Sequence, residues 1–137
     1  KPKWILLDFG ATKVIKGKLL KQYKNLVKSC YTQNRELFFK TFETLGEFEN
    51  YHTLDKDLYW GYIEIMNEPF VHDSYDFGKS DISERALAYL PKLFQGVPEG
   101  SMPAETLFID RKIANVFFVL KTLRCNINVK KIIDEYI

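Results

Sequence analysis

The residues of this chain best suited to chemistry stand near its start, where an acidic residue follows a short apolar run. Residues 4–7 are apolar, and Asp8, Phe9 and Gly10 come directly after them. The length of the run and the Pro2 before it predict a buried strand rather than a helix. A carboxylate at a strand end is a hard oxygen ligand, suited to hold Mg²⁺ against the phosphates of a nucleotide. The glycine lets the backbone turn sharply at this point.

A second copy of the triplet occurs at residues 76–78, and the surroundings distinguish the two copies. Residues 69–80 are rich in loop-forming and charged side chains, which predicts a loop and no strand before the triplet. The first copy is therefore the better candidate, with Asp8 as metal ligand and Phe9 and Gly10 as nucleotide-binding residues. The alternative for Asp8 is a turn or helix cap, a position that aspartate favours regardless of function.

Beyond Gly10 the apolar residues recur three and four positions apart, the spacing of amphipathic helices. About six helices are expected: Leu19 to Tyr31 with lysines opposite, Asn34 to Gly46, Thr53 to Pro69, Asp81 to Gly96, roughly 104–124, and a short segment from about Asn128. Asn34 is a suitable N-cap, and Pro69 is expected to stop the third helix. Asp81 and Glu84 have the spacing of a capping box.

The fifth expected helix, roughly 104–124, is the most apolar segment of the chain. Its apolar residues surround nearly the whole helix: Leu107, Phe108, Ile109, Ile113, Val116, Phe117, Phe118, Leu120 and Leu123. Such a helix is expected in the middle of the fold, with the phenylalanines from 108 to 118 in the core. The longest uninterrupted apolar run, residues 116–120, is far shorter than the roughly 20 residues of a membrane span.

The composition predicts one folded unit, residues 1–137. The chain is 46% hydrophobic and 15% aromatic, which excludes intrinsic disorder because such apolar content collapses into a core. Cys30 and Cys125 stand far apart without a CxxC pattern, so they form no zinc site of their own and favour a reducing compartment. His52 and His72 lack the close spacing of zinc ligands.

The net charge of +2 hides an asymmetry along the chain. Residues 1–28 hold eight lysines and a single acid, Asp8, which gives +7 there and −5 over the rest. A basic segment of this kind suits phosphate, an anionic membrane surface or an acidic partner, and the simplest alternative is a solvated helix face. Nucleic acid is not expected as a partner, because no basic stripe interleaved with aromatic residues recurs along the chain.

The longer string around the first triplet carries a family resemblance. Residues 6–12 read Leu-Leu-Asp-Phe-Gly-Ala-Thr. With this string the chain resembles the UbiB/AarF family of atypical kinases, which is linked to coenzyme Q (ubiquinone) biosynthesis and shows a Leu-Asp-Phe-Gly-Ala-Thr-Arg signature at its metal site. Lys13 stands at the last position, where it keeps the charge of arginine but lacks the planar fork.

The resemblance continues in order along nearly the whole chain. Residues 68–78 contain Glu-Pro-Phe and then Tyr-Asp-Phe-Gly, and they resemble the Glu-Pro-Phe and loop segment of the family. Residues 103–106 and 110–112 are similar to its Pro-Pro-Glu and His-Arg-Lys stretches. Ala104 and Asp110 stand where the family has proline and histidine.

The resemblance implies a mainly α fold: the C-terminal lobe of a protein-kinase-like domain, with one short N-terminal strand followed by about six helices. It implies an atypical kinase or ATPase that binds Mg²⁺ with ATP or ADP and supports ubiquinone biosynthesis, associated with a membrane and with quinone-biosynthesis proteins. The implied location is the matrix side of the mitochondrial inner membrane, or the bacterial cytoplasm or inner membrane.

The same resemblance implies that the chain is inactive by itself. A kinase-like site also needs a loop over the nucleotide, a lysine–glutamate pair and a catalytic loop that supplies aspartate and asparagine. In this family these elements precede the metal motif, so the N-terminal lobe is absent from these 137 residues and no catalytic residue is expected among them.

Two alternatives remain open at the level of sequence. The chain could belong to a non-catalytic kinase-like scaffold or be a helical protein-interaction domain, and the upstream lysine, glutamate, aspartate and asparagine would discriminate these from an enzyme. A small-molecule phosphotransferase of the aminoglycoside or choline type shares the fold but usually carries a different triplet at the metal site.

Overall fold

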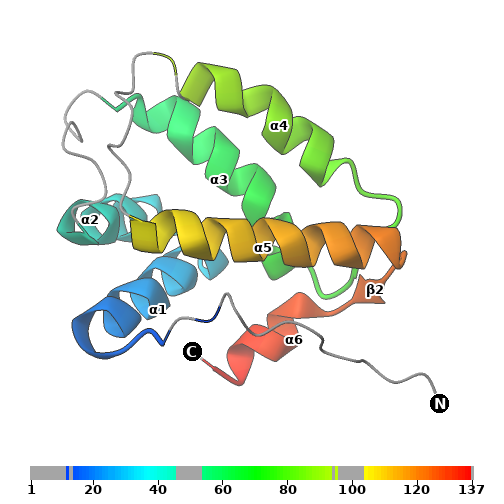
Figure 1. The fold of residues 1–137 in the computed structure, drawn as a ribbon, viewed down its shortest axis with the longest axis horizontal. Helices are drawn as coiled ribbons and strands as arrows, with labels where there is room; N and C mark the ends of the chain where they lie inside the picture. The colour runs from blue at the N-terminus through cyan, green and yellow to red at the C-terminus, as the bar shows by residue number, and fades with distance from the viewer. Residues whose placement is uncertain (1–11, 13, 46–53, 94, 96–103, 137) are drawn as a thin grey trace.

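The chain is described by a computed structural model for residues 12, 14–45, 54–93, 95 and 104–136. The described residues form six helices and one short antiparallel strand pair (Figure 1), which confirms the mainly α fold. The elements are α1 (Gly17–Tyr31), α2 (Arg35–Leu45), α3 (Lys56–Val71), β1 (Tyr75–Asp76), α4 (Ile82–Leu93), α5 (Ala104–Thr122), β2 (Asn126–Ile127) and α6 (Val129–Asp134). The strand expected at residues 4–7 lies outside the described residues.

Helices α1 and α2 are joined by a tight turn that ends one helix and starts the next. The amide of Gln33 donates to the Cys30 carbonyl at 3.1 Å. The amide of Asn34 donates to the Ser29 carbonyl at 2.8 Å, which completes a Schellman motif with Gln33 in the left-handed region at φ 52°. The Asn34 side chain accepts from the amide of Leu37 at 2.9 Å, so the predicted N-cap of α2 is confirmed.

Helix α3 lies at the centre of the described fold and packs against α1, α4 and α6 (Figure 1). Its N-cap is Asp55, whose carboxylate accepts from the amides of Asp57 and Leu58 at 3.1 and 3.0 Å. The expectation that Pro69 stops this helix is wrong, because α3 continues to Val71. The proline deprives only one carbonyl of an amide partner, and the last turn tolerates this loss because the helix ends two residues later.

Helix α5 packs on the described fold with one side only, so the expectation of a helix buried all round is wrong. Phe117 is 7% exposed and contacts α3, whereas its neighbour Phe118 is 68% exposed. Val116, Val119 and Leu123 are exposed as well. A helix is buried all round only when neighbours cover every side, and in the described fold that central place is taken by α3. No described helix is long and apolar enough to cross a membrane.

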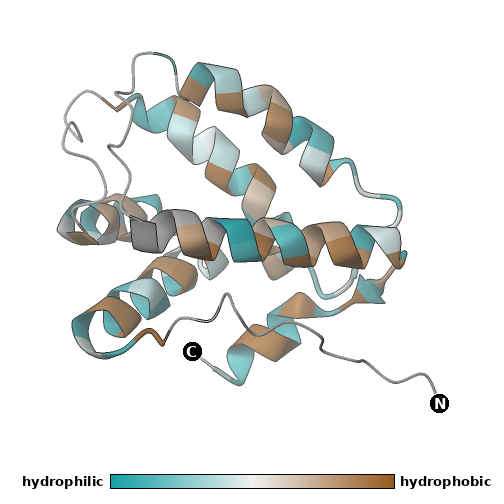
Figure 2. Ribbon diagram, in the orientation of Figure 1, coloured by the Kyte–Doolittle hydropathy of each residue, from teal (hydrophilic) through white to brown (hydrophobic). Residues whose placement is uncertain are grey.

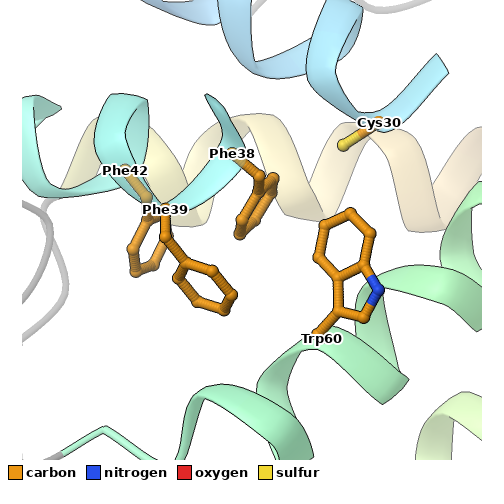
Figure 3. Close-up of a cluster of buried hydrophobic side chains, with 5 residues drawn as sticks. All are labelled: Cys30, Phe38, Phe39, Phe42 and Trp60. Carbon is orange, nitrogen blue, oxygen red and sulfur yellow. The ribbon is translucent and has the colours of Figure 1, made fainter. Parts of the chain in front are cut away.

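Two hydrophobic clusters form the core, and Figure 2 shows the apolar stripes of the helices that build them. The first cluster lies where α1, α2 and α3 meet (Figure 3) and consists of Cys30, Phe38, Phe39, Phe42 and Trp60. The Phe38 ring stacks on Phe42 at a centroid distance of 5.6 Å and meets Trp60 edge-on at 5.5 Å. The second cluster lies between α3, α5 and the strand pair and consists of Tyr75, Phe77, Ile82 and Phe117.

The two short strands connect distant parts of the chain. Tyr75 pairs with Ile127 and Asp76 pairs with Asn126, so the loop after α3 is hydrogen-bonded to the segment after α5. The prediction of a loop over residues 69–80 is therefore only partly right, because this segment contains the end of α3 and the strand β1.

Helix α4 begins without the expected capping box. The hydroxyl of Ser80 accepts from the first amide of the helix at 3.0 Å. The Asp81 carboxylate accepts from Nε of Arg85 at 2.7 Å, and the Glu84 carboxylate binds Nζ of Lys121 at 2.6 and 2.7 Å. Both carboxylates of the expected box bind cations, because charge-assisted hydrogen bonds are stronger than those to a neutral amide.

Candidate functional site

The three residues predicted to bind the metal and nucleotide, Asp8, Phe9 and Gly10, lie outside the described residues. The chain that follows them leads into α1, which starts at Gly17 with a positive φ of 60°. The lysines of α1 lie on its exposed side as predicted: Lys18, Lys21, Lys24 and Lys28. Lys18, Lys21 and Lys28 therefore present their charges to solvent.

The second segment of the family resemblance is held by a network of charged side chains around Glu68. Nη1 and Nη2 of Arg85 donate to the two oxygens of Glu68 at 2.5 and 2.6 Å, in the bidentate geometry of a guanidinium on a carboxylate. The Tyr75 hydroxyl donates to Glu68 Oε2 at 3.0 Å and lies 2.6 Å from the Ser80 hydroxyl. Arg85 also binds Asp81. The network thus joins the end of α3, β1 and the start of α4.

The electrostatics of this network favour its charged form. The hydrogen bonds from Arg85 hold the pKa of the Glu68 carboxyl below its ordinary value, although partial burial opposes this shift. The hydrogen bonds that Arg85 donates to Glu68 raise the pKa of Arg85 in turn. Burial raises the pKa of the Tyr75 hydroxyl. A carboxylate so fully paired is suited to hold the loop in place rather than to accept a proton from a substrate.

The second Asp-Phe-Gly copy has a structural role. The Asp76 carboxylate accepts from the amides of Gly78 and Lys79 at 3.1 and 3.3 Å, so it closes its own turn. Phe77 is fully buried. A Cβ on Gly78 would lie 2.9 Å from the Cα of Arg124, so only glycine fits there. This copy is therefore a packed turn.

A cavity of about 180 Å³ lies between α1, α2, α3 and α5. Its walls are mainly aromatic and aliphatic, with Leu26 and Val27 from α1, Ile63 and Met66 from α3, and Ile113 from α5. Sequence reasoning assigned the same kind of residues to a filled core. The volume arises because α5 approaches the other helices along one side only.

The described part of the chain contains no cluster of metal-ligating side chains. No group of three or more histidine, cysteine, aspartate or glutamate side chains there could hold a metal ion. His72 is exposed and stacks on Tyr75, and His52 lies outside the described residues. Cys30 and Cys125 are free thiols, and burial raises the pKa of Cys30 to about 11.

Arg85 is the residue of the network that sequence reasoning missed. The available signal was its position four residues after Asp81 at the start of a helix, which favours an ion pair on one helix face. The stronger partner, Glu68, is 17 residues away in another helix, and only the packing of α3 against α4 brings the two together.

The chain is similar in sequence to curated proteins named as atypical kinases. It is 24% identical over 129 residues to the mitochondrial atypical kinase coq-8 of Caenorhabditis elegans, and the match covers 93% of this chain and 17% of the relative. It is 28% identical over 131 residues to the mitochondrial atypical kinase COQ8 of Schizosaccharomyces pombe, covering 93% of this chain and 21% of the relative. These matches support the resemblance to the UbiB/AarF family of atypical kinases.

A third relative, the mitochondrial atypical kinase COQ8B of Rattus norvegicus, is 26% identical to this chain over 132 residues, which cover 95% of the chain and 25% of the relative. The chain therefore spans about a fifth of the length of these curated relatives. No family model matches it, and no solved structure gives a significant match.

Proposed function

We propose that this chain is the C-terminal part of an atypical kinase or ATPase, from the metal-binding motif onward, and that it binds Mg²⁺ with a nucleotide. The observation that carries this proposal is the match along at least 93% of the chain to relatives named atypical kinases. The proposed metal site is the segment in which Asp8 follows an apolar run. Asp8 would supply the hard oxygen ligand for Mg²⁺, and Phe9 and Gly10 would form the turn beside the phosphates.

The described helices would serve as the supporting lobe for this site. Glu68 and Arg85 hold the segment between α3 and α4 rigidly, and Phe77 anchors it in the core. A rigid lobe matters because phosphoryl transfer depends on positioning and on charge stabilisation rather than on covalent chemistry by the protein. The 137 residues alone lack the catalytic loop and the phosphate-pairing lysine of such enzymes, so the isolated chain should be inactive.

The pathway and the compartment are proposed from the relatives. All three have names that place them in mitochondria, and the family resemblance points to ubiquinone biosynthesis. We place this protein in the mitochondrion by the same reasoning, on the matrix side of the inner membrane, with proteins of quinone biosynthesis as partners. The exposed lysines of α1, including Lys18, Lys21 and Lys28, provide a face that fits an anionic membrane surface.

The deciding experiment compares full-length wild-type protein with the Asp8→Asn variant. The melting temperature is measured with and without Mg²⁺-ADP, because a ligand that binds only the folded state must raise it. We expect a magnesium-dependent rise in the wild type and no rise in Asp8→Asn, together with loss of nucleotide turnover. Asp76→Asn is the matched control, since Asp76 closes a turn in the other copy of the triplet. It should lower the melting temperature and keep the rise with ligand.

The alternative is a non-catalytic kinase-like scaffold or a helical protein-interaction domain. A melting temperature that Mg²⁺-ADP leaves unchanged in the folded wild type would favour this alternative. Full nucleotide turnover in the Asp8→Asn variant would instead contradict the assignment of Asp8 as the metal ligand.

A further inference from the structure

We propose that the cavity between α1, α2, α3 and α5 is a binding site for a compact, uncharged apolar molecule about the size of one aromatic ring. Its volume is about 180 Å³. An engineered apolar cavity of about 150 Å³ in another protein stays dry and binds benzene. The site is lined by described helices and does not depend on nucleotide binding at Asp8.

The chemistry of the walls selects the class of ligand. None of the side chains that line the cavity is acidic, basic or a histidine. A charged molecule would lose its hydration there without gaining a partner, which is strongly unfavourable. An uncharged apolar molecule loses nothing and gains contact with aromatic and aliphatic walls.

Two polar side chains at the walls, those of Cys30 and Asn67, are buried and hydrogen-bonded to each other. Among the described residues no buried side-chain nitrogen or oxygen lacks a hydrogen-bond partner. A buried water needs two to four polar partners, so these walls favour an apolar ligand over ordered water.

The cavity is built into a rigid frame. Phe38 and Phe42, which line it from α2, stack on each other, and Phe42 also contacts Tyr59 of α3 at a centroid distance of 5.1 Å. These rings fix the distance between α2 and α3. Ala114 also lines the cavity but is exposed to solvent, so it marks the rim on α5. The site is therefore preformed, with an entrance beside a small side chain.

The test follows the isoleucine methyl groups of the full-length protein by NMR during titration with toluene. Ile63 and Ile113 line the cavity, whereas Ile82 and Ile127 do not and serve as internal controls. We expect saturable shifts of Ile63 and Ile113 and a higher melting temperature. Benzoate, a charged molecule of similar size, should bind at least tenfold more weakly.

Two cavity-filling variants test the location. Ala114→Leu and Val27→Phe add volume from α5 and from α1, and each should weaken toluene binding at least tenfold. Ala88→Leu is the matched control, because the same substitution is placed on an exposed position of α4 away from the cavity. If one filled variant fails to fold, the other gives the answer.

Three outcomes would overturn the proposal. They are unshifted Ile63 and Ile113 methyl groups at saturating toluene, undiminished binding in a folded cavity-filling variant, and benzoate binding as strong as toluene binding. A negative result here is distinguishable from a negative result for the proposed function. Toluene binding tests the cavity, whereas the experiment on Asp8→Asn tests the binding of Mg²⁺-ADP.

Discussion

Glu68 and Arg85 bind each other through two parallel hydrogen bonds although they lie 17 residues apart on different helices. The segment between them contains β1 and the packed turn at residues 76–78. The ion pair therefore fastens both ends of this segment, and the Tyr75 hydroxyl fastens its middle to the same carboxylate. Removing one partner should loosen the whole segment rather than a single contact.

Glu68→Gln should lower the free energy of unfolding by about 1 kcal/mol at pH 7, the upper range for a partly exposed ion pair. Arg85 lowers the pKa of Glu68 from its ordinary value of 4.5. A lowered folded-state pKa gives stability that is complete above pH 4.5 and is lost as the pH falls through the folded-state pKa. The difference between wild type and variant should therefore shrink below about pH 4.5.

Urea unfolding of Glu68→Gln and wild type at several pH values measures this difference. Glu84→Gln is the control, because the partner of Glu84, Lys121, forms a more exposed pair and its removal should matter less. A difference between Glu68→Gln and wild type that is constant from pH 7 to pH 3 would contradict the assigned role of the pair.

Phe38→Ala and Phe118→Ala should differ sharply in stability. Phe38 is 1% exposed and contacts the rings of Phe42 and Trp60, so its removal leaves a cavity and should cost about 3–5 kcal/mol. Phe118 is 68% exposed, so its removal should change the free energy of unfolding by less than about 0.5 kcal/mol. Denaturant unfolding of both variants checks the contrast, and equal losses would place Phe118 in a core.

Glycine should stabilise the two helix ends that use a left-handed residue. Gln33 ends α1 at φ 52° and Arg124 follows α5 at φ 51°. The amides of Arg124 and Cys125 donate to the carbonyls of Lys121 and Leu120, as a Schellman motif requires. Because glycine has no Cβ to strain this conformation, Gln33→Gly and Arg124→Gly should each raise the free energy of unfolding by up to about 1 kcal/mol.

The corresponding alanine variants, Gln33→Ala and Arg124→Ala, separate the backbone effect from loss of the side chain. They should not stabilise the protein, because alanine meets the same backbone strain as the native residues. Thermal unfolding distinguishes the two sets, and equal melting temperatures for glycine and alanine variants would contradict this explanation.

Cys30 should resist modification in the folded protein. Burial raises the pKa of its thiol to about 11, so almost no thiolate is present at pH 8, and the side chain is only 9% exposed. Cys125 is less buried and should react faster with iodoacetamide. Peptide mass spectrometry after timed labelling measures both rates, with urea-unfolded protein as the control in which the two thiols become equally reactive.

The parts of the fold that follow from local rules could be predicted from the sequence. Asn34 capped the second helix as its residue type indicates, and the α1 lysines lie on the exposed face that periodicity assigns to them. The ends of α1 and α5 were harder, because Gln33 and Arg124 occupy positions where sequence rules look for glycine. Pro69 was misleading, since a proline in the last turn costs too little to end a helix.

The sequence did not reveal how the helices pack against one another. The most apolar segment, α5, was expected at the centre, but hydropathy does not say how many sides of a helix find neighbours. The Glu68–Arg85 pair likewise depends on the packing of α3 against α4. The predicted site at Asp8 rests on the family match and stays a prediction, because those residues lie outside the described part of the chain.

The contact between Lys24 and Tyr136 has a consequence for the order of folding. Nζ of Lys24 donates to the Tyr136 carbonyl at 2.8 Å across 112 residues, so docking the α6 segment on α1 closes a very long loop. The α1–α2 turn, in contrast, closes within a few residues, so its formation costs little conformational entropy. A six-residue helix such as α6 is unstable by itself. We therefore expect α6 to dock late during folding and to be released first when the native state opens locally.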